Sequence, residues 1–138
     1  MEFHHYPKIL ALGHPQLANL LTGTFMIQEK VDGSQLNWWL DQGHLRIRSK
    51  GAEIYKETCD KLFKPAVDYL HEIKHLLRTG VFYRGETLCK EKHNTLKYNR
   101  VPQHNIILFD MDDGNQNYCD YSAMTIEAAR IGVEAVPC

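Results

Sequence analysis

The sequence predicts an α+β domain in which a mainly antiparallel sheet is flanked by helices. Three observations point to this fold class. Residues 44–48 alternate apolar and polar side chains, as a half-buried strand does, and they follow a short connection at 41–43 that is typical of a hairpin. Apolar residues recur at steps of three and four over 55–77, which predicts a helix. A second helical segment runs to about Ile131.

Length and composition describe one ordinary globular domain over residues 1–138. The chain has 138 residues, of which 43% are hydrophobic and 24% are charged, enough to bury a core. Its 16 basic and 17 acidic residues nearly cancel, so any site for a polyanion must be local. No apolar run reaches the ~20 residues of a membrane span, and the start of the chain is not signal-like. The 4 cysteines form no CxxC pair. We therefore expect a reduced, cytoplasmic protein without a membrane partner.

The first strand is predicted to end at a lysine. Residues 1–23 hold two prolines and favour an extended piece with at most one helical turn, packed along the sheet edge. The apolar run 24–27 then predicts a buried strand ending at Lys30, and Asp32 with Gly33 predicts a tight turn. Lysine amines have a pKa of about 10.4, but those partly buried beside cations reach ~7–8 and attack electrophiles. The alternative is a charged turn without chemistry.

Two paired strands are predicted after this turn, over 35–40 and 44–48. The alternation places Arg46 and Arg48 on one face of the second strand. That face is either solvated or a cationic wall beside Lys30.

The helix predicted over 55–77 is assigned to packing. Pro65 lies inside its pattern and predicts a kink or two abutting helices, and Gly80 is expected to close it. The strand predicted over 81–88 is interrupted by Gly85, which indicates a bulge or a close approach by a ligand. Glu86 follows at the point where a ligand would be met.

The most basic window, 90–100, has no apolar period and is predicted to be a loop. Its cations and Tyr98 suit a phosphate backbone and a stacked base, although a solvated loop explains them equally well. A buried strand is predicted over 105–111. Ser122 is expected to cap the helix that runs to Ile131, and Gly132 to stop it.

Four short motifs stand in order along the chain: Lys30-Val31-Asp32-Gly33, Arg48-Ser49-Lys50-Gly51, Tyr83-Arg84-Gly85-Glu86 and Ile107-Leu108-Phe109-Asp110. Their order and spacing resemble the covalent nucleotidyltransferases, which are ATP-dependent RNA ligases, DNA ligases and mRNA capping enzymes. Within this superfamily the chain looks most like the RNA ligases of bacteria and phages, through Tyr6-Pro7-Lys8-Ile9 and the segment from His93 to Pro102. The resemblance covers nearly the whole chain.

The resemblance implies a role for each motif. Lys30 would attack the α-phosphate of ATP, assisted by Mg²⁺, to form a lysyl-AMP that is passed to a 5′-phosphate RNA end and sealed by a 3′-OH, as in RNA repair. Glu29 would read the adenine edge, Phe109 would stack on the base, and Glu86 would bind the ribose or a metal-bound water. The implied nucleotide-binding residues are Glu29, Asp32, Gly33, Arg48, Glu86 and Phe109. The implied RNA-binding residues are Gln35, Lys50, Lys92, His93, Lys97 and Arg100.

Two departures refine the expectation. Gln35 lies two residues past Gly33, where DNA ligases and capping enzymes usually carry arginine, and this favours an RNA ligase. The apolar-Glu-Gly strand and the paired-lysine strand of the family are not found up to Cys138. The resemblance therefore implies a nucleotidyltransferase domain that is incomplete at its C-terminus and impaired. The alternatives are a non-catalytic nucleotide- or RNA-binding remnant, one half of a split ligase completed by a second chain, and a DNA-ligase or capping-type enzyme.

Overall fold

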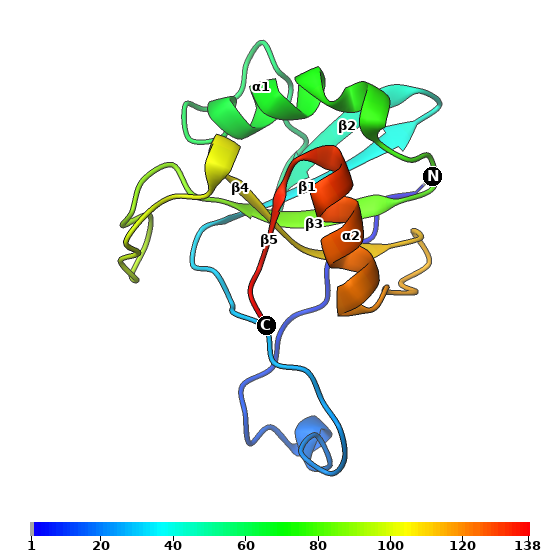
Figure 1. Cartoon of the computed structure of the whole chain (residues 1–138), viewed down its shortest axis with the longest axis vertical. Coiled ribbons are helices and arrows are strands. Elements are labelled where there is room, and N and C mark those ends of the chain that lie inside the picture. The colour runs from blue at the N-terminus through cyan, green and yellow to red at the C-terminus, as the bar shows by residue number, and fades with distance from the viewer. Residues whose placement is uncertain (1) are drawn as a thin grey trace.

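A five-stranded sheet organises the computed structural model, which describes residues 2–138. The strand order is β2-β1-β3-β4-β5, and every neighbouring pair is antiparallel except β4 with β5 (Figure 1). The strands are β1 (Ser34–Asp41), β2 (His44–Ser49), β3 (Phe82–Thr87), β4 (Ile106–Asp112) and β5 (Glu134–Ala135). The prediction of an α+β fold with a mainly antiparallel sheet is confirmed.

Two helices pack on one face of this sheet. They are α1 (Lys64–Glu72) and α2 (Tyr121–Ile131). Elsewhere along the chain there are three short 3-10 turns: η1 (Pro15–Leu17), η2 (Lys74–Leu76) and η3 (Gln103–Asn105). Leu70 of α1 and Met124 of α2 belong to the same buried core as Trp38 of β1. In the part of the chain that the structure describes, neither helix is long and apolar enough to cross a membrane.

The other face of the sheet, which we call the open face, carries the polar side chains. Leu36 and Trp38 of β1 are buried in the core, so the alternate residues Asn37 and Trp39 lie on the open face. Phe3 covers this face, with its ring stacked 5.3 Å from that of Trp39. The N-terminal residues therefore cross the central strands, and the prediction that they pack along the sheet edge is wrong.

The buried strand predicted over 24–27 is also wrong. Residues 24–30 belong to no strand among residues 2–138 and are exposed, with 71% of Ile27 accessible. β1 already has β2 and β3 as neighbours, so no edge of the described sheet is free beside it. Figure 1 shows that this segment follows a loop around η1, which projects from the body of the protein, and returns the chain to it. Lys30 is accordingly exposed and not shielded at a sheet rim.

The helix predicted over 55–77 is shorter in the structure. Residues 55–63 are not helical, and α1 begins with Pro65 in its first turn. Proline suits that position because the first turn of a helix has no use for its missing N–H, so Pro65 starts the helix and does not kink it. Gly80, with φ 84°, turns the chain into β3 after η2 and does not end α1.

Most local signals at turns and helix ends are confirmed. Gln42 and Gly43 both take positive φ, as a two-residue hairpin loop requires, and Gly132 ends α2 in the left-handed conformation. The cap of α2 is Asp120 instead of Ser122, because the Asp120 side chain accepts the backbone N–H three residues ahead at 2.7 Å.

Candidate functional site

The turn at 31–33 joins the projecting loop to β1 and is tied to the basic loop. The backbone N–H groups of Thr95 and Leu96 both donate to Asp32 Oδ2 at 2.8 Å. The Asp32 N–H donates to Tyr98 Oη at 2.7 Å. The backbone N–H groups of Leu96 and Thr95 hold the pKa of Asp32 below its usual range. Tyr98, which the sequence suggested as a base-stacking residue, therefore also fixes the turn.

A second tie joins this turn to His93. The Nε2 atom of His93 lies 2.9 Å from Ser34 Oγ, and its Nδ1 accepts the Cys89 N–H at 3.2 Å. Because Nδ1 accepts, the neutral ring carries its proton on Nε2, which donates to Ser34. Burial lowers the pKa of His93 and favours this neutral form. His93, a predicted RNA-binding residue, is thus held by contacts within the protein.

Gly33 packs the turn against β3. A Cβ atom at this position would lie 2.3 Å from Thr87 O and 3.1 Å from Glu86 Oε2, so the approach requires glycine. Glu86 also stands opposite Gln35 in the β1–β3 register. The geometry brings together Gly33, Gln35 and Glu86, three of the predicted site residues.

Glu86 carries an unsatisfied buried oxygen at this junction. Its Oε2 is buried and has no hydrogen-bond partner within the described structure. Burial raises the pKa of Glu86 to about 7, against the opposing effects of the Lys30 charge and the Gly33 N–H. The Lys30 charge also helps to lower the pKa of Asp32, so this exposed amine acts on both carboxylates.

A hollow of about 160 Å³ lies beside Phe109. Met26 and Gln28 form one side of it, and the Gln28 side chain donates to the Phe109 carbonyl at 3.4 Å. Lys30 follows Gln28 by two residues. Alternate side chains of an extended chain point to the same side, so Lys30 is expected on the same side of the chain as Gln28. Phe109 is half-buried, with its ring edge-on to Tyr6 at 5.0 Å.

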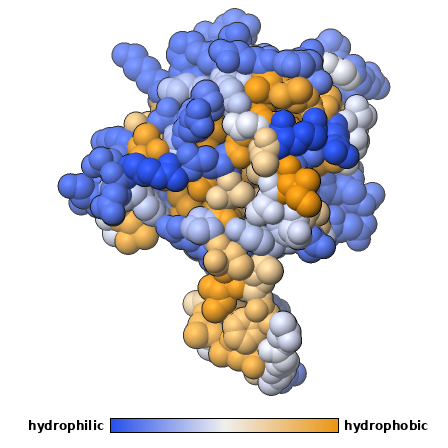
Figure 2. All heavy atoms as spheres, in the orientation of Figure 1, coloured by the Kyte–Doolittle hydropathy of each residue, from blue (hydrophilic) through white to orange (hydrophobic). Residues whose placement is uncertain are grey.

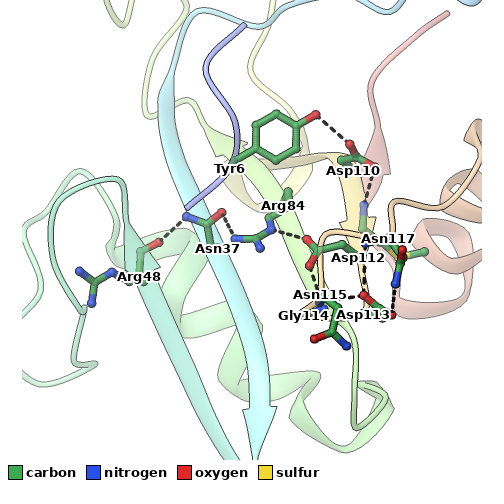
Figure 3. Close-up of polar contacts among 11 residues, drawn as sticks. Tyr6, Asn37, Arg48, Arg84, Asp110, Asp112, Asp113, Gly114, Asn115 and Asn117 are labelled. Carbon is green, nitrogen blue, oxygen red and sulfur yellow. Dashed lines mark hydrogen bonds and ion pairs between the residues drawn. The ribbon is translucent and has the colours of Figure 1, made fainter. Parts of the chain in front are cut away.

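A buried polar network lies on the open face of the sheet (Figure 3). The Nε of Arg84 is 2.7 Å from Asp112 Oδ2, and both side chains are fully buried. Arg84 also donates to Asn37 Oδ1 at 3.3 Å, and the Asn37 amide donates to the backbone oxygen of Arg48. No local sequence pattern predicts this network, because Arg84 and Asp112 are 28 residues apart.

Phe3 and Tyr6 close this network from outside. The Phe3 ring centroid is 5.0 Å from Arg48 Cζ and 5.2 Å from Arg84 Cζ. Tyr6 Oη donates to Asp110 Oδ2 at 2.8 Å, and burial raises the pKa of both Tyr6 and Asp110. Arg48, a predicted nucleotide-binding residue, is therefore covered on one side by Phe3.

The remaining predicted cations differ in their surroundings. Arg100 makes a two-pronged contact with Glu134, at 3.0 and 2.7 Å. Arg46 contacts Glu53 and Asp41, so it adds no unpaired charge to a cationic wall. Three predicted RNA-binding cations are exposed to solvent: Lys50, Lys92 and Lys97.

Replacing Glu86 by glutamine is expected to change how stability depends on pH. The pKa of Glu86 is raised from 4.5 to about 7, so between these values the folded state keeps a proton that the unfolded state releases. The contribution of Glu86 to the free energy of unfolding therefore falls as pH rises from about 4.5 through 7. Glutamine mimics the protonated acid, so Glu86→Gln should be more stable than the wild type above pH 7 by up to about 3 kcal/mol.

Urea unfolding of both proteins at several pH values measures this difference. Glu91→Gln, at an exposed carboxylate, is the matched control and should shift stability equally at all pH values. A difference between Glu86→Gln and wild type that does not vary with pH would contradict the burial of Glu86.

Comparisons with known proteins agree with this fold. A family model described as RNA ligase matches residues 23–138. Similar solved structures are a lysine-to-alanine mutant of Naegleria gruberi RNA ligase with ATP and Mn (15% identity, TM-score 0.62) and the same ligase with PPi (15%, 0.55). A third is a mutant of Naegleria gruberi RNA ligase R4a without ligand (18%, 0.58). Each covers 80% of this chain, which spans 34% of the solved chain. No curated protein matches the sequence.

Proposed function

Because the chain belongs to the RNA ligase family, we propose that it is the nucleotide-binding part of an ATP-dependent RNA ligase in which Lys30 accepts AMP. One observation carries the proposal. The Gly33 turn packs closely on β3 beside the buried, unpartnered oxygen of Glu86, and the charge of Lys30 acts on that carboxyl group. A lysine charge near an unsatisfied acceptor suits a site that binds a phosphorylated sugar.

The chemistry follows from a lysine nucleophile. As the free amine, Lys30 Nζ forms a bond to the α-phosphorus of ATP while the bond from that phosphorus to the β-phosphate oxygen breaks, and pyrophosphate leaves. The amine gives up its proton to solvent. A 5′-phosphate oxygen of RNA then displaces the lysine from phosphorus, and a 3′-hydroxyl of RNA attacks the activated phosphate and releases AMP.

The surrounding residues divide into binding and shaping roles. Phe109 offers an aromatic wall beside the hollow, and stacking of a base on such a wall contributes ~1–3 kcal/mol. Glu86 Oε2 is an acceptor for a ribose hydroxyl, and Glu29 is proposed for the adenine edge. Both Asp32 and Gly33 shape the turn, since the Asp32 carboxylate is already engaged by backbone N–H groups.

A divalent cation fits this site only in partnership with phosphates. Among residues 2–138, no group of three or more His, Cys, Asp or Glu side chains is suited to a metal ion. Mg²⁺ commonly uses one or two carboxylates, waters and substrate phosphates, so Glu86 would hold it through water. Such an ion neutralises charge on the transferred phosphates.

RNA is proposed to bind across the turn and the basic loop. The exposed cations Lys50, Lys92 and Lys97 would contact phosphates, with Arg100 and His93 at the margin of the same loop. Gln35 lies next to Glu86 across the strand pair and would meet the RNA end at the reacting phosphate.

Lys30→Ala is expected to abolish covalent labelling by α-labelled ATP. Wild-type protein incubated with Mg²⁺ and ATP labelled at the α-phosphate should retain label after denaturation, slowly, because the family's paired lysines are not among these residues. ATP labelled at the γ-phosphate should leave none, since pyrophosphate departs. Lys61→Ala, at another exposed lysine, is the control and should label like wild type. If Lys30→Ala retained as much label as the wild type, the proposal would be contradicted.

A nucleotide-binding protein that does not transfer AMP is the second candidate. It is favoured by the exposure of Lys30, because a lysine amine becomes nucleophilic near neutral pH when it is partly buried. In that case calorimetry should detect ATP binding to both the wild type and Lys30→Ala, and neither protein should retain label.

A further inference from the structure

His93 joins two parts of the fold that meet at the turn before β1. Its Nε2 atom lies 2.9 Å from Oγ of Ser34, the first residue of β1. Its Nδ1 atom accepts the backbone N–H of Cys89, in the chain that leaves β3, at 3.2 Å. The ring is half-buried, and Ser34 directly follows Gly33 of the turn. One imidazole therefore connects the turn at 31–33 with the beginning of the basic loop.

The loop that carries His93 has little apolar packing of its own. Figure 2 shows mostly hydrophilic residues at the left of the view, where Figure 1 places this loop. Between Cys89 and Lys97, every residue except His93 is exposed. A segment with few buried apolar contacts depends on its hydrogen bonds and opens readily when they are lost.

Hydrogen bonds from the residues after His93 fix the turn. The Asn94 amide donates to Gly33 O at 2.8 Å and to Asp32 Oδ1 at 3.2 Å. The N–H groups of residues 95 and 96 both donate to the Asp32 carboxylate. His93 directly precedes these donors in the chain, so loss of its ring contacts frees the backbone from which they project.

The contacts of His93 require a neutral ring. In the neutral form Nδ1 has a lone pair for the Cys89 N–H, and Nε2 carries the proton that is donated to Ser34. A protonated imidazole carries N–H groups at both nitrogens. Its Nδ1 proton would point at the Cys89 N–H, so two donors would face each other and this hydrogen bond would be lost. Rotation of the charged ring restores nothing, because both of its nitrogens are donors.

The surroundings of the ring favour its neutral form. Burial, the largest effect, lowers the pKa of His93 below its usual 6.5, while the Asp32 carboxylate opposes this change and the Lys90 charge adds to it. Asp32 stays ionised where His93 titrates, since backbone N–H groups hold its pKa below 3.8. Glu86 of β3 lies against Gly33 and has a pKa of about 7, so its titration has to be separated from that of His93.

We propose that neutral His93 is a positioning residue for the Lys30 turn and that protonation of its ring releases this turn. Loss of the Cys89 hydrogen bond frees the start of the loop, and the bonds to Asp32 and Gly33 weaken in consequence. The effect on catalysis rests on the role proposed for Lys30, whereas the release itself occurs without ATP. A direct contact between His93 and an RNA phosphate would favour the charged ring, so that role has the opposite dependence on pH.

NMR of the full chain, without ATP or RNA, tests this inference. The ¹⁵N shifts of the ring should identify the form with its proton on Nε2 at about pH 7.5. Between about pH 7.5 and about pH 5, protection of the Cys89 amide against hydrogen exchange should fall roughly tenfold or more, as loss of one hydrogen bond of ordinary net strength produces. Protection of the Thr95 and Leu96 amides, which report on the turn, should fall with the same midpoint as the His93 ring titrates. The same changes are expected in Glu86→Gln, where this carboxyl group no longer titrates.

His93→Gln separates protonation of this ring from other effects of pH. Glutamine keeps a donor and an acceptor but takes up no proton in this range, so the Cys89, Thr95 and Leu96 amides should keep their protection as pH falls. His75→Gln, at an exposed histidine, is the matched control and should behave like the wild type.

Three results would overturn the inference. One is a neutral wild-type ring that carries its proton on Nδ1 at about pH 7.5. Another is protection of the Cys89 and turn amides that does not change while the wild-type His93 ring titrates. The third is an equal fall of protection in His93→Gln, which would assign the change to another group. Because ATP is absent, each readout is the same whether or not Lys30 accepts AMP.

Discussion

Asp112→Asn is expected to remove about 3–5 kcal/mol of folding stability, because it takes the ion-pair partner away from the buried guanidinium of Arg84. The two side chains are fully buried and 2.7 Å apart. Asparagine keeps the volume of aspartate, so the loss does not come from a cavity. Since small domains are stable by only ~5–15 kcal/mol, urea unfolding should show a large drop in the midpoint.

Two further variants separate the cause from other effects at this position. Asp68→Asn breaks the exposed pair with Lys64 and should cost less than about 1 kcal/mol. Arg84→Met combined with Asp112→Asn removes the unpaired charge as well, so the double variant should recover part of the loss. If the double variant is less stable than Asp112→Asn alone, the loss arises from the turn that Asp112 also holds through Gly114 N–H.

Strands with a partner close in sequence were predictable. The alternation over 44–48 and the hairpin before it specify β1 and β2 from local information, and Gly85 correctly indicated a bulge, which the register shift between Arg84 and Gly85 confirms. The groups that approach Gly85 closely are the Ile107 carbonyl and the Trp38 ring. Residues 24–27 are apolar, as a buried strand is, but they have no partner strand within residues 2–138. Hydrophobicity alone therefore did not predict whether they form a strand.

The candidate site was predictable in its order and not in its contacts. Motif order alone grouped Lys30, Gly33 and Glu86, and the structure places Gly33 against Glu86, whose carboxyl group is influenced by the charge of Lys30. The hydrogen bonds to Asp32 from backbone N–H groups some 60 residues away could not be predicted from the local sequence, since any loop offers such groups. The cover of the open face by Phe3 was equally hidden, because an aromatic residue near a chain end has many places to pack.

Gly33→Ala is expected to have the largest effect on the chemistry proposed for Lys30. The new Cβ would meet the backbone oxygen of Thr87 at 2.3 Å, so the turn must move away from β3. Overpacking of this kind costs typically ~1–3 kcal/mol of stability. A shift of about 1 Å in the position of a reacting group costs on the order of 10²-fold in rate. The rate of labelling by α-labelled ATP should fall accordingly, with ATP binding reduced less.

A readout other than activity shows whether the turn has moved. The amides of Thr95 and Leu96 donate to Asp32, so displacement of the turn should speed their hydrogen exchange in Gly33→Ala. Gly51→Ala is the matched control, because a Cβ there meets nothing within 4 Å. Unchanged exchange and unchanged labelling in Gly33→Ala would mean that the turn tolerates the added methyl group. The close approach to β3 would then not be what positions Lys30 beside Glu86.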